Sequence, residues 1–199
     1  MFRAELPRLY TLRDCIADPA SSDAYSRDFD QNLARDAHVK DVYLRQERLL
    51  QGLDDKAWEH LKEEARPLLT ARDNRGRGWP QLFDILNEAR AYNYLKSLGC
   101  TNLRFIPRSH EKNEKSADLE RSLPLHCVWC EVETINISDE EIAFRTVPPK
   151  ARSLPITITA GFLKKLRATV ETAKQQLSAF DHGRAAVLQA LMMIWPKHR

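Results

Sequence analysis

The chain has 199 residues, of which 43% are hydrophobic and 30% are charged, and its formal net charge at pH 7 is +3. This composition is typical of one ordinary globular domain with a modest appendage, and it excludes collagen-like and low-complexity chains. The longest apolar runs, such as Ala185 to Trp195, contain polar breaks and are shorter than the ~18 residues of a membrane span. The first residues lack the continuous apolar segment of a secretory signal, so we expect a cytoplasmic protein with no membrane partner.

The charge is distributed unevenly along the chain. Residues 1–66 carry 11 Lys and Arg against 14 Asp and Glu, whereas residues 67–199 carry 20 against 14. The basic excess lies in short clusters around Arg72 to Arg77, Arg108 to Lys115, Arg145 to Arg152, and Lys164 to Arg167. A modestly basic half suits a polyanionic partner, and an ordinary solvated surface often carries the same excess. The charge alone therefore leaves both interpretations open.

The N-terminal part of the chain has a helical pattern. Residues 1–30 show weak periodicity, which predicts mostly loop with one short helix. From about residue 30 to residue 70, apolar residues recur at helical spacing in two stretches. Gly52 separates these stretches, and Asp54 stands where the N-cap of the second helix is expected.

A basic segment that contains glycine, residues 73–78, predicts a linker after these helices. We therefore divide the chain into a helical N-terminal region at 1–72, the linker, and a core at 79–199. Within the core the pattern predicts a helix from Pro80 to Leu95 with Gly99 as its stop, strands at 102–107, 116–120 and 125–136, a helix at 159–180 and a strand at 185–195. This order predicts an α/β core in which a small mixed sheet is flanked by helices.

Acidic residues stand on two neighbouring strands of this predicted sheet. Asp118 ends the strand at 116–120, and Glu131 and Glu133 lie two residues apart on the next strand, which places them on one face. The opposite face includes Cys130 and Val132 and is expected to face the core. Asp118 can meet the two glutamates across the hairpin. Carboxylates gathered in this way repel one another unless a proton or a cation neutralises them, and oxygen ligands suit Mg²⁺ or Mn²⁺.

This pattern resembles the PD-(D/E)xK nuclease-like superfamily, whose fold is called restriction-endonuclease-like. The resemblance is carried by Ser-Ala-Asp118-Leu-Glu, a hairpin, and Val-Trp-Cys-Glu131-Val-Glu133-Thr-Ile. In that superfamily an Asp ends one strand and a D/E-x-K motif lies on the next, with an acid-bearing helix before them and a helix and strand after them. The resemblance covers about residues 79–195, and Glu88 matches the additional acid that some members carry on the preceding helix.

The resemblance implies a restriction-endonuclease-like core that hydrolyses phosphodiester bonds of nucleic acid. It implies that Asp118, Glu131 and Glu88 hold Mg²⁺ or Mn²⁺, which polarises a phosphoryl oxygen and lowers the pKa of a bound water. Glu133 would orient or deprotonate that water. Lys115, just before the Asp118 strand, would bring a positive charge to the site, and Lys164 or Arg167 would hold the nucleic-acid backbone.

The sequence departs from the superfamily pattern at two positions. Ala117 replaces the usual proline, which is common among members. Glu133 occupies the position of the lysine and inverts its charge, although some members use a second glutamate there as a base or metal ligand. The alternative is a catalytically inactive relative that acts as a nucleic-acid- or protein-binding module.

Each acidic residue also has a structural interpretation without chemistry. Asp118 is then a turn residue, Glu131 and Glu133 form the solvated side of an edge strand, and Glu88 is a surface charge on its helix.

Overall fold

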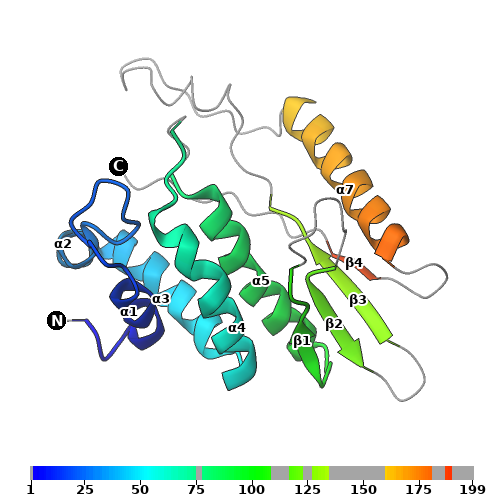
Figure 1. The fold of residues 1–199 in the computed structure, drawn as a ribbon, viewed down its shortest axis with the longest axis horizontal. Helices are drawn as coiled ribbons and strands as arrows, with labels where there is room; N and C mark the ends of the chain where they lie inside the picture. The colour runs from blue at the N-terminus through cyan, green and yellow to red at the C-terminus, as the bar shows by residue number, and fades with distance from the viewer. Residues whose placement is uncertain are drawn as a thin grey trace.

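Helices build the first half of the protein and a small sheet follows them (Figure 1). The structure, a computed structural model, describes residues 2–74, 78–108, 117–122, 127–134, 160–180 and 187–189. Its helices are α1 (Pro7–Asp14), α2 (Phe29–Arg35), α3 (Ala37–Gln51), α4 (Asp55–Ala65), the 3₁₀ helix η1 (Arg66–Thr70), α5 (Pro80–Ser97) and α7 (Ala160–Phe180). Its strands are β1 (Leu103–Phe105), β2 (Leu119–Ser122), β3 (Cys127–Val132) and β4 (Val187–Gln189). The predicted α/β class is therefore confirmed.

The sheet is mixed, as the sequence predicts, with the strand order β1-β2-β3-β4. β1, β2 and β3 pair antiparallel, and β4 pairs with β3 in parallel. Leu119 lies opposite both Phe105 and Cys130 in this register. The end of β1, the start of β2 and the end of β3 therefore meet at one end of the sheet, along the direction of the strands.

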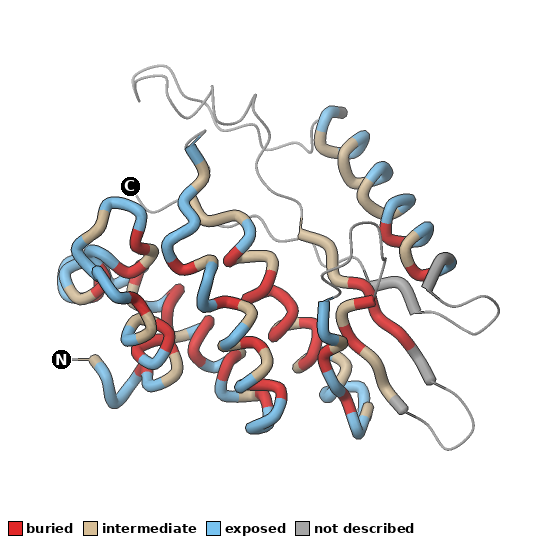
Figure 2. The backbone as a smooth tube through the Cα atoms, in the orientation of Figure 1, coloured by how far each residue is buried: buried red, intermediate tan, exposed pale blue. Residues whose placement is uncertain are grey.

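The two faces of the sheet are covered by different helices. Phe105, Leu119 and Cys130 belong to the main core, which they share with side chains of α1 to α5. Trp129 points to the other face and packs with Leu177 of α7. Figure 2 shows the buried residues running through α5 and β3, with α7 on the opposite side of the sheet from α5. The sheet is thus enclosed between α5 and α7.

Local capping explains where several helices begin and end. Asp54 Oδ1 accepts a hydrogen bond of 2.9 Å from the Ala57 N–H, so the predicted N-cap of α4 is confirmed. Gly99 follows α5 with a φ of +81°, the left-handed conformation that favours glycine after a helix. Asp36 caps α3 through the His38 and Val39 N–H groups, and it interrupts a stretch in which the sequence predicted no break.

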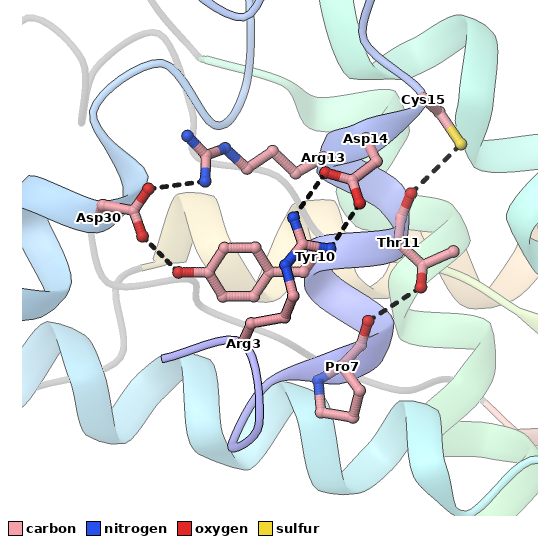
Figure 3. A network of polar contacts seen from close by, with 8 residues as sticks. All are labelled: Arg3, Pro7, Tyr10, Thr11, Arg13, Asp14, Cys15 and Asp30. Atoms are coloured by element: carbon pink, nitrogen blue, oxygen red, sulfur yellow. Dashed lines mark hydrogen bonds and ion pairs between the residues drawn. The ribbon is translucent and has the colours of Figure 1, made fainter. Parts of the chain in front are cut away.

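The first helix is attached to α2 by an aromatic contact and by a polar network, and Figure 3 shows the polar network. Tyr10 is only 1% exposed and meets Phe29 edge to face, with ring centroids 5.2 Å apart. Its hydroxyl donates to Asp30, which also pairs with Arg13 at 2.6 Å, and Arg3 makes two hydrogen bonds to Asp14. Exposed ion pairs contribute little to stability, so the buried Tyr10 ring supplies most of this attachment.

The observed strands are shorter than the predicted ones, and this changes the place of Asp118. Asp118 comes directly before β2 rather than at the end of a strand, so this part of the prediction is wrong. Its backbone still joins both neighbours, because its N–H donates to the Cys130 carbonyl and its carbonyl accepts from the Ile106 N–H. β2 continues after Asp118, and its last residues, Arg121 and Ser122, also pair with β3.

Within the described ranges, every helix is too short or too polar to cross a bilayer.

Candidate functional site

Carboxylates from α5 and from the strands gather at the end of the sheet where β1 ends and β2 begins. Asp118 interacts electrostatically with Glu88 of α5 and with Glu131 of β3. Two further carboxylates join this group, Asp84 of α5 and Glu133 directly after β3, because each interacts with Asp118. We call these five residues the carboxylate cluster. The structure thus brings together Asp118, Glu131, Glu133 and Glu88.

Asp118 and Glu131 are neighbours across β2 and β3. Asp118 precedes Leu119 and Glu131 follows Cys130, which is the partner of Leu119, so the two acids lie side by side at the end of the paired region. Oδ2 of Asp118 accepts a hydrogen bond of 2.7 Å from the N–H of Val132, the residue after Glu131. This bond holds the Asp118 carboxylate against the end of β3.

Glu131 is buried under α7. Only 4% of the residue is exposed, and its Oε1 accepts a hydrogen bond of 2.8 Å from Gln176 Nε2 of α7. Its Oε2 is buried and has no hydrogen-bond partner among the described residues. The alternative in which Glu131 lies on the solvated side of an edge strand is therefore wrong, because β3 lies between β2 and β4 and α7 covers this face.

Glu88 is a buried acid with a cationic partner. It is 5% exposed, so the interpretation as a surface charge on its helix is wrong. Nη2 of Arg108, which follows β1, lies 2.5 Å from Oε1 of Glu88 and 3.8 Å from Oδ1 of Asp118. In the sequence Arg108 belongs to a basic cluster, and no motif there indicates a role at the site. Its position just after the strand that adjoins Asp118 is the signal that could have identified it.

Burial raises the pKa values of these acids. Burial, together with the charges of Asp118 and Glu133, raises the pKa of Glu131 to about 9. Burial and Asp118 raise the pKa of Glu88 to about 8, although Arg108 opposes this change. Burial raises the pKa of Asp118 to about 6, even though the hydrogen bond from Val132 lowers it. The negative charges of the cluster are thus incompletely compensated, which is common at functional sites.

Glu133 is half-buried directly after the end of β3, and its pKa is also raised, by burial first and then by Asp118 and Asp84. Lys115, the predicted source of positive charge, lies outside the described residues. Lys164 and Arg167 are exposed on α7, twelve and nine residues before Gln176. At 1.5 Å per helical residue they are about 18 Å and 13 Å along the helix from the residue that contacts Glu131.

Two polar residues of α5, Asp84 and Asn87, also interact with this end of the sheet and were not predicted from the sequence. Asp84 lies one turn before Glu88, and this i, i+4 spacing of acids on the face of a predicted helix is the available signal. Asn87, 2% exposed, donates a hydrogen bond of 2.9 Å from its Nδ2 to Oγ1 of Thr134. This bond ties α5 to the chain just after β3, and no pattern in the sequence indicates it.

The donor atoms of the site can be compared with the needs of a divalent cation. Within the parts of the chain that the structure describes, no three His, Cys, Asp or Glu side chains form a group that could hold a metal ion. Mg²⁺, however, commonly binds through one or two carboxylates and completes its shell with water and substrate phosphate. Asp118 and Glu131, which are neighbours across β2 and β3, are the two carboxylates that such a smaller ligand set would use, and Oε2 of Glu131 has no partner among the described residues. No protein-family model, curated protein or solved structure matches the chain.

Proposed function

We propose that the protein hydrolyses phosphodiester bonds of nucleic acid with the help of Mg²⁺ or Mn²⁺, on a restriction-endonuclease-like core. The observation that carries the proposal is that Asp118 and Glu131 lie side by side at one end of the sheet. A buried carboxylate oxygen of Glu131 has no hydrogen-bond partner among the described residues. The element order α5, β1, β2, β3, α7, β4 also agrees with the order expected for the PD-(D/E)xK superfamily.

In this proposal Asp118 and Glu131 hold the divalent cation. A bound cation of this kind polarises a phosphoryl oxygen and lowers the pKa of its water. Gln176 fixes the Glu131 carboxylate through Oε1, which leaves Oε2 available as a ligand. The Val132 N–H fixes Asp118 in the same way through Oδ2, while Oδ1 faces Arg108 Nη2 at 3.8 Å.

Glu133 acts as the general base. It is half-buried, and its pKa is raised by burial and by Asp118. A raised pKa lies closer to neutral pH, and a general base works best when its pKa is near the pH of the reaction. The carboxylate accepts a proton from the attacking water at one of its oxygens. The position that carries a lysine in the superfamily pattern thus supplies a base here rather than a positive charge.

The test is cleavage of plasmid DNA, single-stranded DNA and RNA in Mg²⁺, in Mn²⁺ and in EDTA. We expect cleavage with either cation, loss of cleavage in EDTA, and loss of cleavage in Glu131→Ala because a cation ligand is removed. Glu63→Ala is the matched control, since Glu63 is an exposed glutamate on α4. Cleavage that survives Glu131→Ala or EDTA would contradict the proposal.

The second candidate function is a binding module that has lost the chemistry. Two observations favour it: Glu133 stands at the position of the motif lysine, and the positive charge of Arg108 already partners Glu88 and Asp118. This candidate predicts that Mg²⁺ and Mn²⁺ leave the melting temperature unchanged. A metal site would instead raise the melting temperature by mass action.

A further inference from the structure

Arg108 lies beside the carboxylate cluster, in contact with Glu88 and near Asp118. Its Nη2 lies 2.5 Å from the Glu88 carboxylate, and the Glu88 side chain is only 7% exposed. The Arg108 side chain is 47% exposed. A guanidinium carries five N–H donors, and among the described residues the hydrogen bonds of Arg108 come from Nη2 alone. One end of the guanidinium is therefore anchored at Glu88, and the side chain as a whole is half-exposed.

A polyanion that approaches the carboxylate cluster needs a positive charge near it. The superfamily pattern would place a lysine at position 133, and this chain has a glutamate there. Lys164 and Arg167 are about 18 Å and 13 Å along α7 from Gln176, too far to contact a phosphate held at Asp118. Arg104 of β1 is paired with Glu120. Arg108, by contrast, lies 3.8 Å from the Asp118 carboxylate.

We propose that Arg108 binds a phosphate of the nucleic-acid backbone beside Asp118, and that Glu88 is the positioning residue that holds Arg108 there rather than a metal ligand. This inference rests on the nucleic-acid partner of the proposed function. Arginine suits the role because its planar fork matches phosphate oxygens and stays charged at every accessible pH. Glu88 suits its role because a buried carboxylate in the middle of α5 offers a fixed anchor.

The experiment measures binding of a labelled oligonucleotide, single-stranded and duplex, in EDTA over a range of salt concentrations. EDTA prevents cleavage and removes any contribution of a metal. We expect Arg108→Gln to lower the affinity about tenfold, the usual value of one charge-assisted hydrogen bond. We also expect it to reduce the slope of log affinity against log salt by about one, since one phosphate contact is lost.

Arg104→Gln is the matched control, because it removes the same charge four residues away, where Arg104 pairs with Glu120. It should leave the affinity within about twofold of the parent and the salt slope unchanged. Glu88→Gln should weaken binding less than Arg108→Gln and leave the salt slope unchanged, since the arginine remains and its anchor changes from a carboxylate to a weaker, neutral amide oxygen. If Arg108→Gln fails to fold because Glu88 loses its partner, the double variant Glu88→Gln/Arg108→Gln takes its place.

The outcomes separate this inference from the proposed function. A parent protein that cleaves in Mg²⁺, together with an Arg108→Gln variant that keeps its affinity and salt slope, overturns the role of Arg108 alone. A parent that binds without cleaving, with the expected loss in Arg108→Gln, overturns hydrolysis and supports the phosphate contact. A parent that neither binds nor cleaves nucleic acid overturns both.

Discussion

Asn93 of α5 packs its side chain directly against Gly52, the residue that ends α3. A Cβ atom on Gly52 would lie 1.9 Å from Oδ1 of Asn93, far inside van der Waals contact. Asn93 is held in this place by hydrogen bonds from its Nδ2 to the carbonyls of Leu49, at 2.8 Å, and Ala89, at 2.6 Å. The glycine that the sequence marks only as a helix break is therefore required by the close approach of α3 and α5.

Gly52→Ala is expected to lower the free energy of unfolding by about 1–2 kcal/mol, because Asn93 must move and lose its hydrogen bonds. Chemical denaturation measures this change. The φ of Gly52 is −70°, so alanine has no backbone strain there. In an Asn93→Ala background the same substitution should therefore be close to neutral. Equal costs in the two backgrounds would show that Asn93 is not the cause.

Glu47 of α3 caps the N-terminus of α1. It is 1% exposed, its Oε1 accepts from the Arg8 N–H at 3.1 Å, and its Oε2 accepts from the Leu9 N–H at 2.9 Å. Glu47→Ala leaves these first-turn N–H groups without partners, and we expect a loss of about 2–4 kcal/mol in unfolding free energy. Glu63→Ala, at an exposed glutamate of α4, should cost less than about 1 kcal/mol. Similar costs for the two variants would contradict this capping role.

The burial of Glu131 predicts a pH-dependent stability. Its pKa is about 9 in the folded protein against an ordinary value of 4.5, so the folded state binds more protons between these values. The contribution of Glu131 to the free energy of unfolding is therefore fully present below about pH 4.5 and falls as the pH rises toward 9. Glu131→Gln cannot ionise, and at pH 8 it should be more stable than the parent by roughly 1–3 kcal/mol. Thermal melts from pH 4 to pH 9 measure this difference, and a pH-independent difference would contradict it.

The same ionisation predicts how Mg²⁺ acts. Protons and the cation compete for Asp118 and Glu131, whose pKa values are raised to about 6 and about 9. The increase in melting temperature that Mg²⁺ causes should therefore be larger at pH 8 than at pH 6, and it should be absent in Glu131→Gln. An equal increase in parent and variant would place the cation elsewhere.

Glu133→Lys tests the residue at the lysine position directly. If Glu133 is the base, the variant should lose at least about 100-fold in cleavage rate. It should also melt at a higher temperature, since the positive charge meets Asp118 and Asp84, the acids that raise the pKa of Glu133. Cleavage rates with plasmid DNA and thermal melts measure both effects. Cleavage gained by the variant from an inactive parent would instead identify a nuclease that has lost its chemistry.

The sequence by itself determined the elements whose causes are local. Apolar spacing predicts α4, α5 and α7, and single residues mark their ends, as Asp54 does for α4 and Gly99 for α5. Alternation on the β3 segment also predicted that Cys130 faces the core. Period and capping depend on neighbours a few residues apart, so they can be recognised without knowing how the chain folds.

Only the tertiary structure decided what surrounds the acids. Arg108 reaches Glu88 across 20 positions, and Gln176 reaches Glu131 across 45. Neither contact has a periodic signal, because each depends on how α5 and α7 pack against the sheet. The same packing buries Glu131, a residue whose place on a strand alternating with apolar side chains looks solvated in the sequence. Burial depends on both faces of the sheet being covered, and no local pattern of a strand records what covers its second face.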